Sequence, residues 1–309
     1  MIDGRLHMHN TITDPWMKLK CYLNQEDYDL VKALQAECLR EEQISLKLEL
    51  DYKLAVAANR AEKPEDRPMN EFMAFDGEKL IGYIGICGFG GASMPLEITG
   101  MVHPEYRRQG VFSALHALVL AECKRRNAAA LWLCDKSSAA GQAFIKHIGA
   151  KYKSSEFEMV FRGDVLPVRE DQLQGIRFRK ATNADAGEVA RQNKIYFSDS
   201  AEAQQEDNGP LPEEEEKRGM TIYLAEKGSR PVGKVNLEFI NGIGGIYGLG
   251  VLPEYRGLGY GRAILLMSLQ RLKDAHQIGL QVSAVNARAL GLYKSCGFEE
   301  TSVMDYFAV

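Results

Sequence analysis

The sequence predicts an α/β (α+β) fold built from two copies of one unit. Three observations support this prediction. Strands and capped helices near the start of the chain return in the second half, and each half contains one strand–turn–helix stretch. Between the halves, residues 162–175 form a polar segment with proline and glycine, which is typical of a linker. The predicted domains are therefore residues 1–163 and residues 176–309.

Each copy begins with a strand and a capped helix. Polar and apolar side chains alternate in residues 17–23 and again in residues 176–181. Asn24 and Thr182 follow these strands, and each has an acidic residue three places further on. This spacing is typical of a helix N-terminus, so we expect a helix after each strand.

A hairpin and a strand–turn–helix stretch follow in both copies. The hairpins are expected at residues 72–86 and 222–237, the first with an Asp-Gly turn. Residues 101–112 and residues 250–261 then match each other in the order of apolar, proline, tyrosine, arginine and glycine positions. Each copy closes with an apolar strand, a helix and a further strand. The agreement over the whole length indicates an internal repeat.

The stretch from Gly248 to Arg262 predicts a phosphate site. A short apolar strand leads into a turn with glycine at every second place, and a helical pattern follows. The first N–H groups of a helix and its dipole favour an anion, and glycines let the backbone approach it closely. Arg256 adds a cation. The stretch lacks the Gly-Lys-Ser/Thr ending of a P-loop, and its G-x-G-x-G spacing differs from a dinucleotide fingerprint, so redox chemistry with a dinucleotide is excluded.

Two motifs in the second half resemble those of the GNAT superfamily of N-acyltransferases. The loop R-G-x-G-x-G at residues 256–261, preceded by V-x-P-x-Y at residues 251–255, resembles the family's acyl-CoA loop. The run N-x-x-A-x-x-L-Y-x-x-x-G-F at residues 286–298 resembles its second signature. The resemblance implies two tandem GNAT-like domains, each a mixed, mostly antiparallel sheet flanked by helices. The strands beside the coenzyme A site would splay apart.

The implied function is transfer of an acetyl group from acetyl-CoA to a primary amine of a small molecule or peptide. The implied contacts to coenzyme A in the second half are Leu249, Gly250, Val251, Arg256, Gly257, Leu258, Gly259, Tyr260, Gly261, Arg262, Asn286 and Tyr293. The corresponding residues of the first half are Met101, Val102, Arg107, Arg108, Gln109, Gly110, Val111 and Phe112. A coenzyme A-binding sensor or scaffold without turnover is the alternative function.

The reaction needs a donor for the oxyanion and a proton for the departing thiolate. A bulge allowed by Gly248 and Gly250 would release a backbone N–H near residues 249–251 as the donor. By resemblance, Tyr293 is the general acid, and Asn286, two helical turns earlier, would hold the pantetheine arm or a water. The alternative for Tyr293 is an aromatic residue of the core.

The general base is left open by the sequence. In several family members a glutamate stands on the strand before the loop, at the place of Tyr247 and of Ile98. Glu97 lies one residue away and should point to the other face of its strand. Glu238 and the terminal carboxylate of Val309 are further candidates.

The first half departs from the family pattern. Phe112 replaces the third loop glycine, while Ser138 and Ile145 stand at the places of the asparagine and the tyrosine. Ile145 cannot donate a proton, so we expect a degenerate copy that completes the fold, or one that binds coenzyme A without the same acid. The insertion at residues 198–219 contains the run Glu213–Glu216, which predicts either a solvated loop or helix start, or a lid that attracts a cationic amine.

Composition limits the partners. The 309 residues carry a formal net charge of −4, which disfavours nucleic acid and anionic membranes as partners. No apolar run reaches the ~20 residues needed to span a bilayer, and the first residues show no signal-peptide core. Six scattered cysteines and single histidines predict neither a zinc site nor a disulfide framework, and they fit a reducing cytoplasm. The sequence does not indicate an oligomeric state.

Overall fold

The computed structural model describes residues 11–58, 68–88, 95–165, 169–173, 175–196 and 211–309. Part of the predicted linker and residues 198–210 of the insertion lie outside these ranges, as do residues 59–67. The chain divides into two compact units. Of the described residues, unit 1 comprises those up to Gly88, Leu96–Lys151 and Phe307–Val309, and unit 2 comprises Pro95 and Tyr152–Tyr306. No helix in the described ranges is long and apolar enough to cross a membrane.

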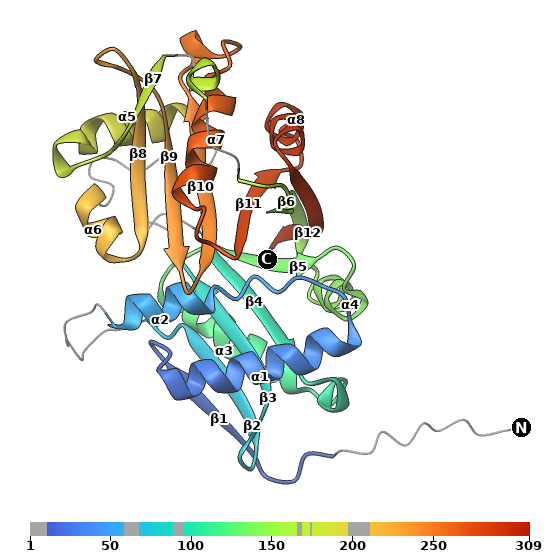
Figure 1. The fold of residues 1–309 in the computed structure, drawn as a ribbon. Helices are drawn as coiled ribbons and strands as arrows, with labels where there is room; N and C mark the ends of the chain where they lie inside the picture. The colour runs from blue at the N-terminus through green and yellow to red at the C-terminus, as the bar shows by residue number, and fades with distance from the viewer. Residues whose placement is uncertain (1–10, 59–67, 89–94, 166–168, 174, 197–210) are drawn as a thin grey trace, which may run out of the picture. The chain divides into compact units, whose positions relative to one another are not determined.

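Unit 1 is a mixed sheet with helices on both faces (Figure 1). Its strands, in spatial order, are β1 (Pro15–Lys20), β2 (Glu71–Asp76), β3 (Lys79–Cys87), β4 (Leu96–Val102) and β5 (Ala130–Asp135). Neighbours are antiparallel except β4 and β5, which are parallel. The helices are α1 (Gln25–Glu41), α2 (Leu50–Ala58), α3 (Val111–Arg125) and α4 (Ala139–His147).

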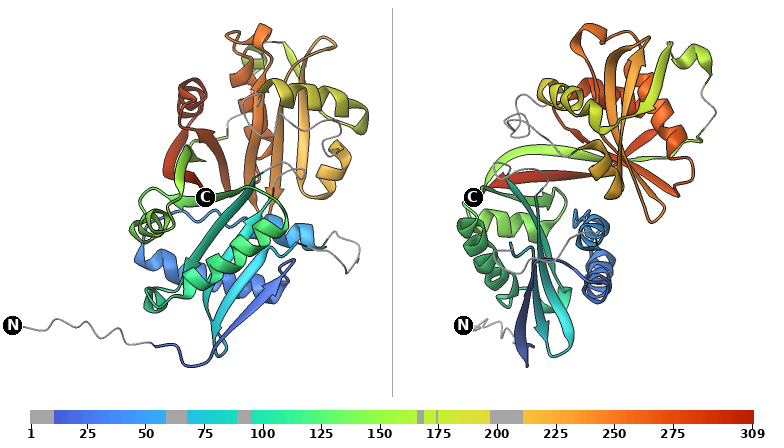
Figure 2. Two further views of the ribbon diagram at one scale, coloured as in Figure 1. Left: turned by 180° about the vertical axis from the view of Figure 1, so that it is seen from behind. Right: turned by 90° about the vertical axis from the view of Figure 1, so that its left-hand side faces the viewer.

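The two faces of this sheet bury different side chains. Leu115 of α3 packs with Ile84 and Trp132 in one apolar cluster. Leu34 of α1 packs with Tyr83 in another cluster on the opposite face. Figure 2 shows α1 and α2 on one side of the strands and α3 on the other. The alternation of side chains along β3 therefore divides the core into two layers.

Unit 2 repeats this plan. Its strands, in spatial order, are β12 (Phe298–Ala308), β6 (Lys151–Phe161), β11 (Gln277–Ser283), β10 (Ile243–Val251), β9 (Arg230–Ile240), β8 (Met220–Lys227) and β7 (Ile176–Lys180). The helices are α5 (Ala186–Tyr196), α6 (Pro212–Lys217), α7 (Tyr260–Arg271) and α8 (Ala287–Ser295). β10 and β11 are parallel, like β4 and β5 in unit 1. The predicted mixed, mostly antiparallel sheets are confirmed.

One strand of the first sequence repeat belongs to the sheet of unit 2. β6 pairs antiparallel with β11, from Glu156↔Ser283 to Val160↔Gly279. Conversely, Phe307 near the end of the chain joins the core of unit 1. The compact units therefore divide at Lys151, whereas the repeat pattern places the boundary at residue 163.

Local sequence signals position the elements as expected. The side chain of Asn24 accepts a hydrogen bond from the Asp27 N–H at 2.9 Å and begins α1. Thr182 and Asp185 form a reciprocal capping box before α5. Gly77 takes a positive φ of 57° in the turn between β2 and β3. Helix α2 was not predicted, because its sequence carries no clear cap or apolar stripe.

Candidate active site

The glycine loop of unit 2 connects β10 to α7. After a 3-10 turn at Pro253–Tyr255, Gly257 and Gly259 take φ values of 82° and 83°. Glycine adopts this left-handed region without the steric cost that a Cβ brings. Arg256 is exposed, and its Nε donates to the Val251 carbonyl at 3.0 Å, so the turn presents its cation to solvent. The loop therefore places the backbone N–H groups at the start of α7 next to a positive charge.

The structure brings this loop against α8, which carries the second motif. Arg262 donates to the Ser295 carbonyl at 3.3 Å and to its hydroxyl at 2.6 Å. A Cβ on Gly261 would lie 3.4 Å from Leu292 Cδ2. The two predicted motifs, distant in sequence, are thus neighbours. Within the loop, Leu258 is exposed, whereas Tyr260 is buried and its hydroxyl accepts from Lys227 Nζ at 2.8 Å.

The two predicted catalytic residues lie at different depths in α8 and its cap. Tyr293 is buried in the core beneath α7, with its ring centroid 6.0 Å from that of Phe298. Burial raises the pKa of its phenol to about 12. Asn286 is exposed, and its side-chain oxygen accepts from the Ala289 N–H at 3.1 Å, which caps α8. Asn286 therefore has a structural role in the free protein, in addition to any role toward a ligand.

The predicted bulge and the predicted splay are both present in β10. The pairing with β9 shifts between Tyr247↔Asn236 and Gly250↔Lys234, so two residues of β10 face one residue of β9. Gly248 in the bulge has a φ of 54°. The parallel pairs with β11 end at Ile246↔Leu280, although both strands continue. Leu249, Gly250 and Val251 therefore lie, half-buried, where the two strands separate.

Polar side chains line β9 beside the bulge. Val235 and Leu237 belong to the core under α7, so the residues that alternate with them along the strand face the opposite side of the sheet, toward α5. These are Lys234, Asn236 and Glu238. The hydroxyl of Tyr247 on β10 donates to Glu238 at 3.4 Å. The sequence indicated Tyr247 and Glu238 as places for a base, but not the fully buried Lys234, whose only signal is a lysine inside an apolar strand.

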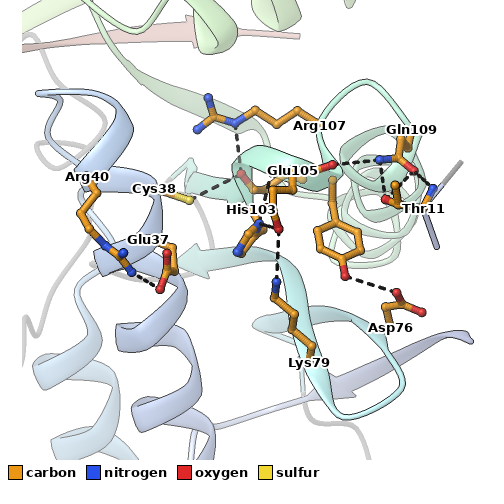
Figure 3. A network of polar contacts seen from close by, with 12 residues as sticks. Thr11, Glu37, Cys38, Arg40, Asp76, Lys79, His103, Glu105, Arg107 and Gln109 are labelled. Carbon is orange, nitrogen blue, oxygen red and sulfur yellow. Dashed lines mark hydrogen bonds and ion pairs between the residues drawn. The ribbon is translucent and has the colours of Figure 1, made fainter. Parts of the chain in front are cut away.

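The corresponding loop of unit 1 keeps its shape but is closed by side chains. Gly110 has a φ of 85°, and Arg107 Nε donates to the Val102 carbonyl at 3.2 Å, as in unit 2. Arg107 also forms an ion pair with Glu42. Gln109 accepts from the backbone N–H of Thr11 at 2.9 Å, as Figure 3 shows. The Arg107 guanidinium and the Gln109 amide of this loop are therefore engaged within the protein, whereas Arg108 is exposed.

Phe112 occupies the space beside the separated strands of unit 1. Its ring centroid lies 6.2 Å from Trp132 on β5 and 4.5 Å from Phe144 on α4. A Cβ on Gly100 of β4 would lie 3.0 Å from the same ring. The ring thus contacts both β4 and α4, the helix that corresponds to α8, whereas unit 2 has Gly261 at this loop position.

The other site residues predicted in unit 1 lie in the core or on the surface. Met101, Val102 and Val111 are buried, while Arg108 is exposed with a φ of 63° where unit 2 has Gly257. Ser138 caps α4 by accepting from the Gly141 N–H at 3.2 Å, as Asn286 caps α8, and Ile145 is buried at the tyrosine place. The alignment of the second motif is therefore confirmed as a structural correspondence.

The remaining candidates for the base are constrained, because Glu97 forms a 3.0 Å ion pair with Lys47 and Val309 is exposed in unit 1. Ile98, at the glutamate place of the first half, is fully buried. The acidic run forms helix α6, in which Glu214 pairs with Lys217 at 2.8 Å and Glu215 with Arg218 at 2.7 Å. These ion pairs agree with a solvated helix start.

Comparison with known proteins agrees with this architecture. The model of the acetyltransferase (GNAT) family matches residues 30–150 and 189–298. A mycothiol acetyltransferase of Thermobispora bispora is 27% identical over 289 residues, which cover 81% of this chain and 92% of the relative. An N-alpha-acetyltransferase of Sulfolobus acidocaldarius is 27% identical over 162 residues, covering 46% of this chain and 92% of the relative.

A tandem GNAT protein from the clavulanic acid biosynthesis pathway has the same fold. It superposes with a TM-score of 0.68 over 96% of this chain and 98% of its own, at 14% identity. The repeated fold and the glycine loop beside α8 define a tandem acetyltransferase. The family model matches most of the chain, in both repeats, and the chain belongs to the GNAT acetyltransferase family.

Proposed function

We propose that unit 2 transfers an acetyl group from acetyl-CoA to a primary amine of a small molecule or peptide. The observation that carries the proposal is the glycine loop at the start of α7, held against α8 beside the point where β10 and β11 separate. GNAT acetyltransferases use acetyl-CoA, and the residues of this loop fit it. Gly257 and Gly259 take positive φ values that a side chain would strain, and together with the exposed Arg256 they form the cradle.

Residues 256–262 would hold the pyrophosphate, and Leu249 to Val251 would line the pantetheine arm. When bound, acetyl-CoA supplies an activated acetyl thioester. The bulge would leave the Leu249 N–H of unit 2 as a backbone donor for the carbonyl oxygen that gains charge. Because the buried Tyr293 phenol has a pKa of about 12, it stays protonated at neutral pH and can act as a donor. That high pKa also makes proton donation to the departing thiolate unfavourable by itself.

We assign proton removal from the amine to Glu238. Its carboxylate accepts from Tyr247, the residue at the place where several family members carry a glutamate. It also lies on the α5 face of the sheet, away from the α7 face that carries the glycine loop. A carboxylate there can accept a proton directly or through one water.

Two relatives bear on the acceptor. Similarity to a mycothiol acetyltransferase extends over 81% of this chain, whereas similarity to an N-alpha-acetyltransferase covers 46%. The first likeness spans both units and favours a small-molecule amine. The acidic run adds little to this preference, because its carboxylates are paired within α6 or with neighbouring residues.

Acetyl transfer to an amine panel tests the proposal. The panel contains small aliphatic amines, the acceptor of mycothiol acetyltransferases, and peptides with a free α-amine. We expect release of coenzyme A to depend on one amine and to fall in Tyr293→Phe. If no amine stimulates release while coenzyme A binds to both proteins equally well, the chain is a coenzyme A-binding sensor or scaffold.

A further inference from the structure

Lys234 is a buried lysine that has no role in the acetyl transfer proposed above. It lies in the middle of β9 and is fully buried. Its Nζ donates to the Asn236 side-chain oxygen at 3.1 Å and to the Gly248 carbonyl at 3.4 Å. Burying an ammonium group costs free energy even when it is hydrogen-bonded. An apolar residue would fill this place in a strand at lower cost, so we ask what the ammonium group does.

Its backbone partner is the glycine inside the bulge of β10. Gly248 has a φ of 54°, and a Cβ there would lie 3.1 Å from Lys234 Nζ. In a trans peptide the C=O of one residue and the N–H of the next point in opposite directions. Because the Gly248 carbonyl accepts from Lys234 Nζ, the Leu249 N–H points away from that ammonium group.

We propose that Lys234 is a positioning residue that fixes the Gly248–Leu249 peptide so that the Leu249 N–H faces the gap between β10 and β11. The inference rests on the proposed acetyl transfer, in which this N–H stabilises the charge that develops on the acetyl oxygen. Held from its carbonyl end by a positive charge, the peptide group is also polarised toward a stronger N–H donor.

Unit 1 supports the link between the lysine and the bulge. Lys234 pairs with Gly250 in unit 2, and the residue at the same register position of β3 is Tyr83, which pairs with Met101. The Tyr83 hydroxyl bonds to Lys53 and Glu71. Along β3 and β4 the register runs without a shift. The lysine at this position and the bulge therefore occur together in unit 2, and unit 1 shows neither along these two strands.

The test uses the full chain and compares Lys234→Met with Lys234→Arg. Methionine keeps the length of the side chain and removes the donor, while arginine keeps a donor. Ser268→Ala is the matched control, because Ser268 is equally buried in unit 2 and its hydroxyl donates within α7, to the Ile264 carbonyl at 2.8 Å. We expect Lys234→Met to lower kcat by about 100-fold, with the Kd for coenzyme A within about 3-fold of wild type. Lys234→Arg should recover part of the loss, and Ser268→Ala should match wild type.

Hydrogen exchange of residues 243–251 gives a readout that does not depend on activity. We expect exchange in this segment to change in Lys234→Met and to stay unchanged in Ser268→Ala. A folded Lys234→Met protein with wild-type kcat and wild-type exchange in this segment would overturn the proposal.

If Lys234→Met does not fold, a second variant tests the proposal. Gly248→Ala perturbs the same peptide and should likewise lower kcat without changing the Kd for coenzyme A. A wild-type kcat in Gly248→Ala would also overturn the proposal. If wild type transfers no acetyl group, the proposed function fails, while the exchange data still test the role of Lys234.

Discussion

The two units share one fold but differ at the places where an acetyltransferase works. In unit 2 the third loop position is Gly261, which packs closely against Leu292 of α8, while in unit 1 it is Phe112, whose ring packs against Phe144. In unit 2 the loop arginine is exposed, whereas Arg107 of unit 1 is paired with Glu42. Both units therefore share the backbone of the loop, but only unit 2 combines an exposed arginine at this position with a glycine in place of the Phe112 ring.

The two units also differ on the sheet face that lies away from α3 in unit 1 and away from α7 in unit 2. In unit 1, the face under α1 and α2 holds an apolar cluster that includes Leu34, Met73 and Met101. On the α5 face of unit 2, the described residues form a smaller apolar cluster around Val189 and Leu224, next to the polar row on β9. The face of unit 1 is mainly apolar around the buried Lys53–Glu71 pair, whereas the polar row of unit 2 lies beside a strand bulge, where an amine can be received. We infer that unit 1 supports the structure and unit 2 carries the reaction.

The largest expected effect on activity concerns Tyr293, the proposed general acid. Tyr293→Phe removes the phenol that unit 2 alone carries at this place, and we expect kcat to fall by about 10²–10³-fold with the Kd for coenzyme A unchanged. Ile145→Val at the corresponding place of unit 1 is the control and should leave kcat unaltered. Steady-state kinetics and calorimetric titration of both variants check this. A Tyr293→Phe enzyme with full activity would make the residue a core aromatic.

The buried lysines should separate stability from activity. Lys53 Nζ pairs with Glu71 at 2.9 Å, and both side chains are buried in unit 1. Because Lys53→Met leaves a buried carboxylate without its counter-ion, we expect it to lower the free energy of unfolding by about 3 kcal/mol. At low temperature, kcat of Lys53→Met should equal that of the wild type. Chemical denaturation and kinetics of Lys53→Met, compared with Lys234→Met, measure both effects; loss of kcat in folded Lys53→Met would place part of the site in unit 1.

A smaller difference is expected between the two loop arginines. Arg256→Ala removes an exposed cation from the proposed phosphate cradle, so the Kd for coenzyme A should rise by about 10-fold, the range of a hydrogen bond to a charged group. Arg107→Ala instead breaks an ion pair with Glu42 and should leave the Kd within about 2-fold of wild type. Titration at two salt concentrations adds a check, because only the Arg256 effect should shrink as salt screens the charge. Equal losses from both variants would mean that both loops contact the ligand.

The pH dependence should be the subtlest effect. The general acid must be protonated, and the pKa of Tyr293 is raised to about 12, so its protonation is complete well below that value and is lost only as pH rises toward it. We therefore expect kcat of the wild type to show no fall between pH 7 and pH 10 from this group. A falling limb in that range that disappears in Tyr293→Phe would show that the bound enzyme has a much lower phenol pKa.

The sequence predicted those features that depend on local residue patterns. The repeat, the glycine loop, the caps at Asn24 and Thr182 and the bulge near Gly248 follow from side chains whose conformational preferences act over a few residues, and the structure contains each of them. The pairing of β6 with β11 was not predictable, because an alternating strand can join any sheet edge of suitable register. The buried position of Lys234 was missed for a related reason, since its acceptors on Gly248 and Asn236 become neighbours only when β9 and β10 pair.

The most direct test of the central claim is the number of coenzyme A molecules that bind per chain and which glycine controls that binding. Gly259 and Gly110 begin α7 and α3 with φ values of 83° and 85°, so an alanine at either place meets the same backbone strain of about 1 kcal/mol. Calorimetric titration of the full chain should give one coenzyme A per chain. We expect Gly259→Ala to weaken binding by at least about 10-fold and Gly110→Ala to leave it unchanged. Two coenzyme A molecules per chain, or a loss of binding in Gly110→Ala, would contradict the assignment of the reaction to unit 2.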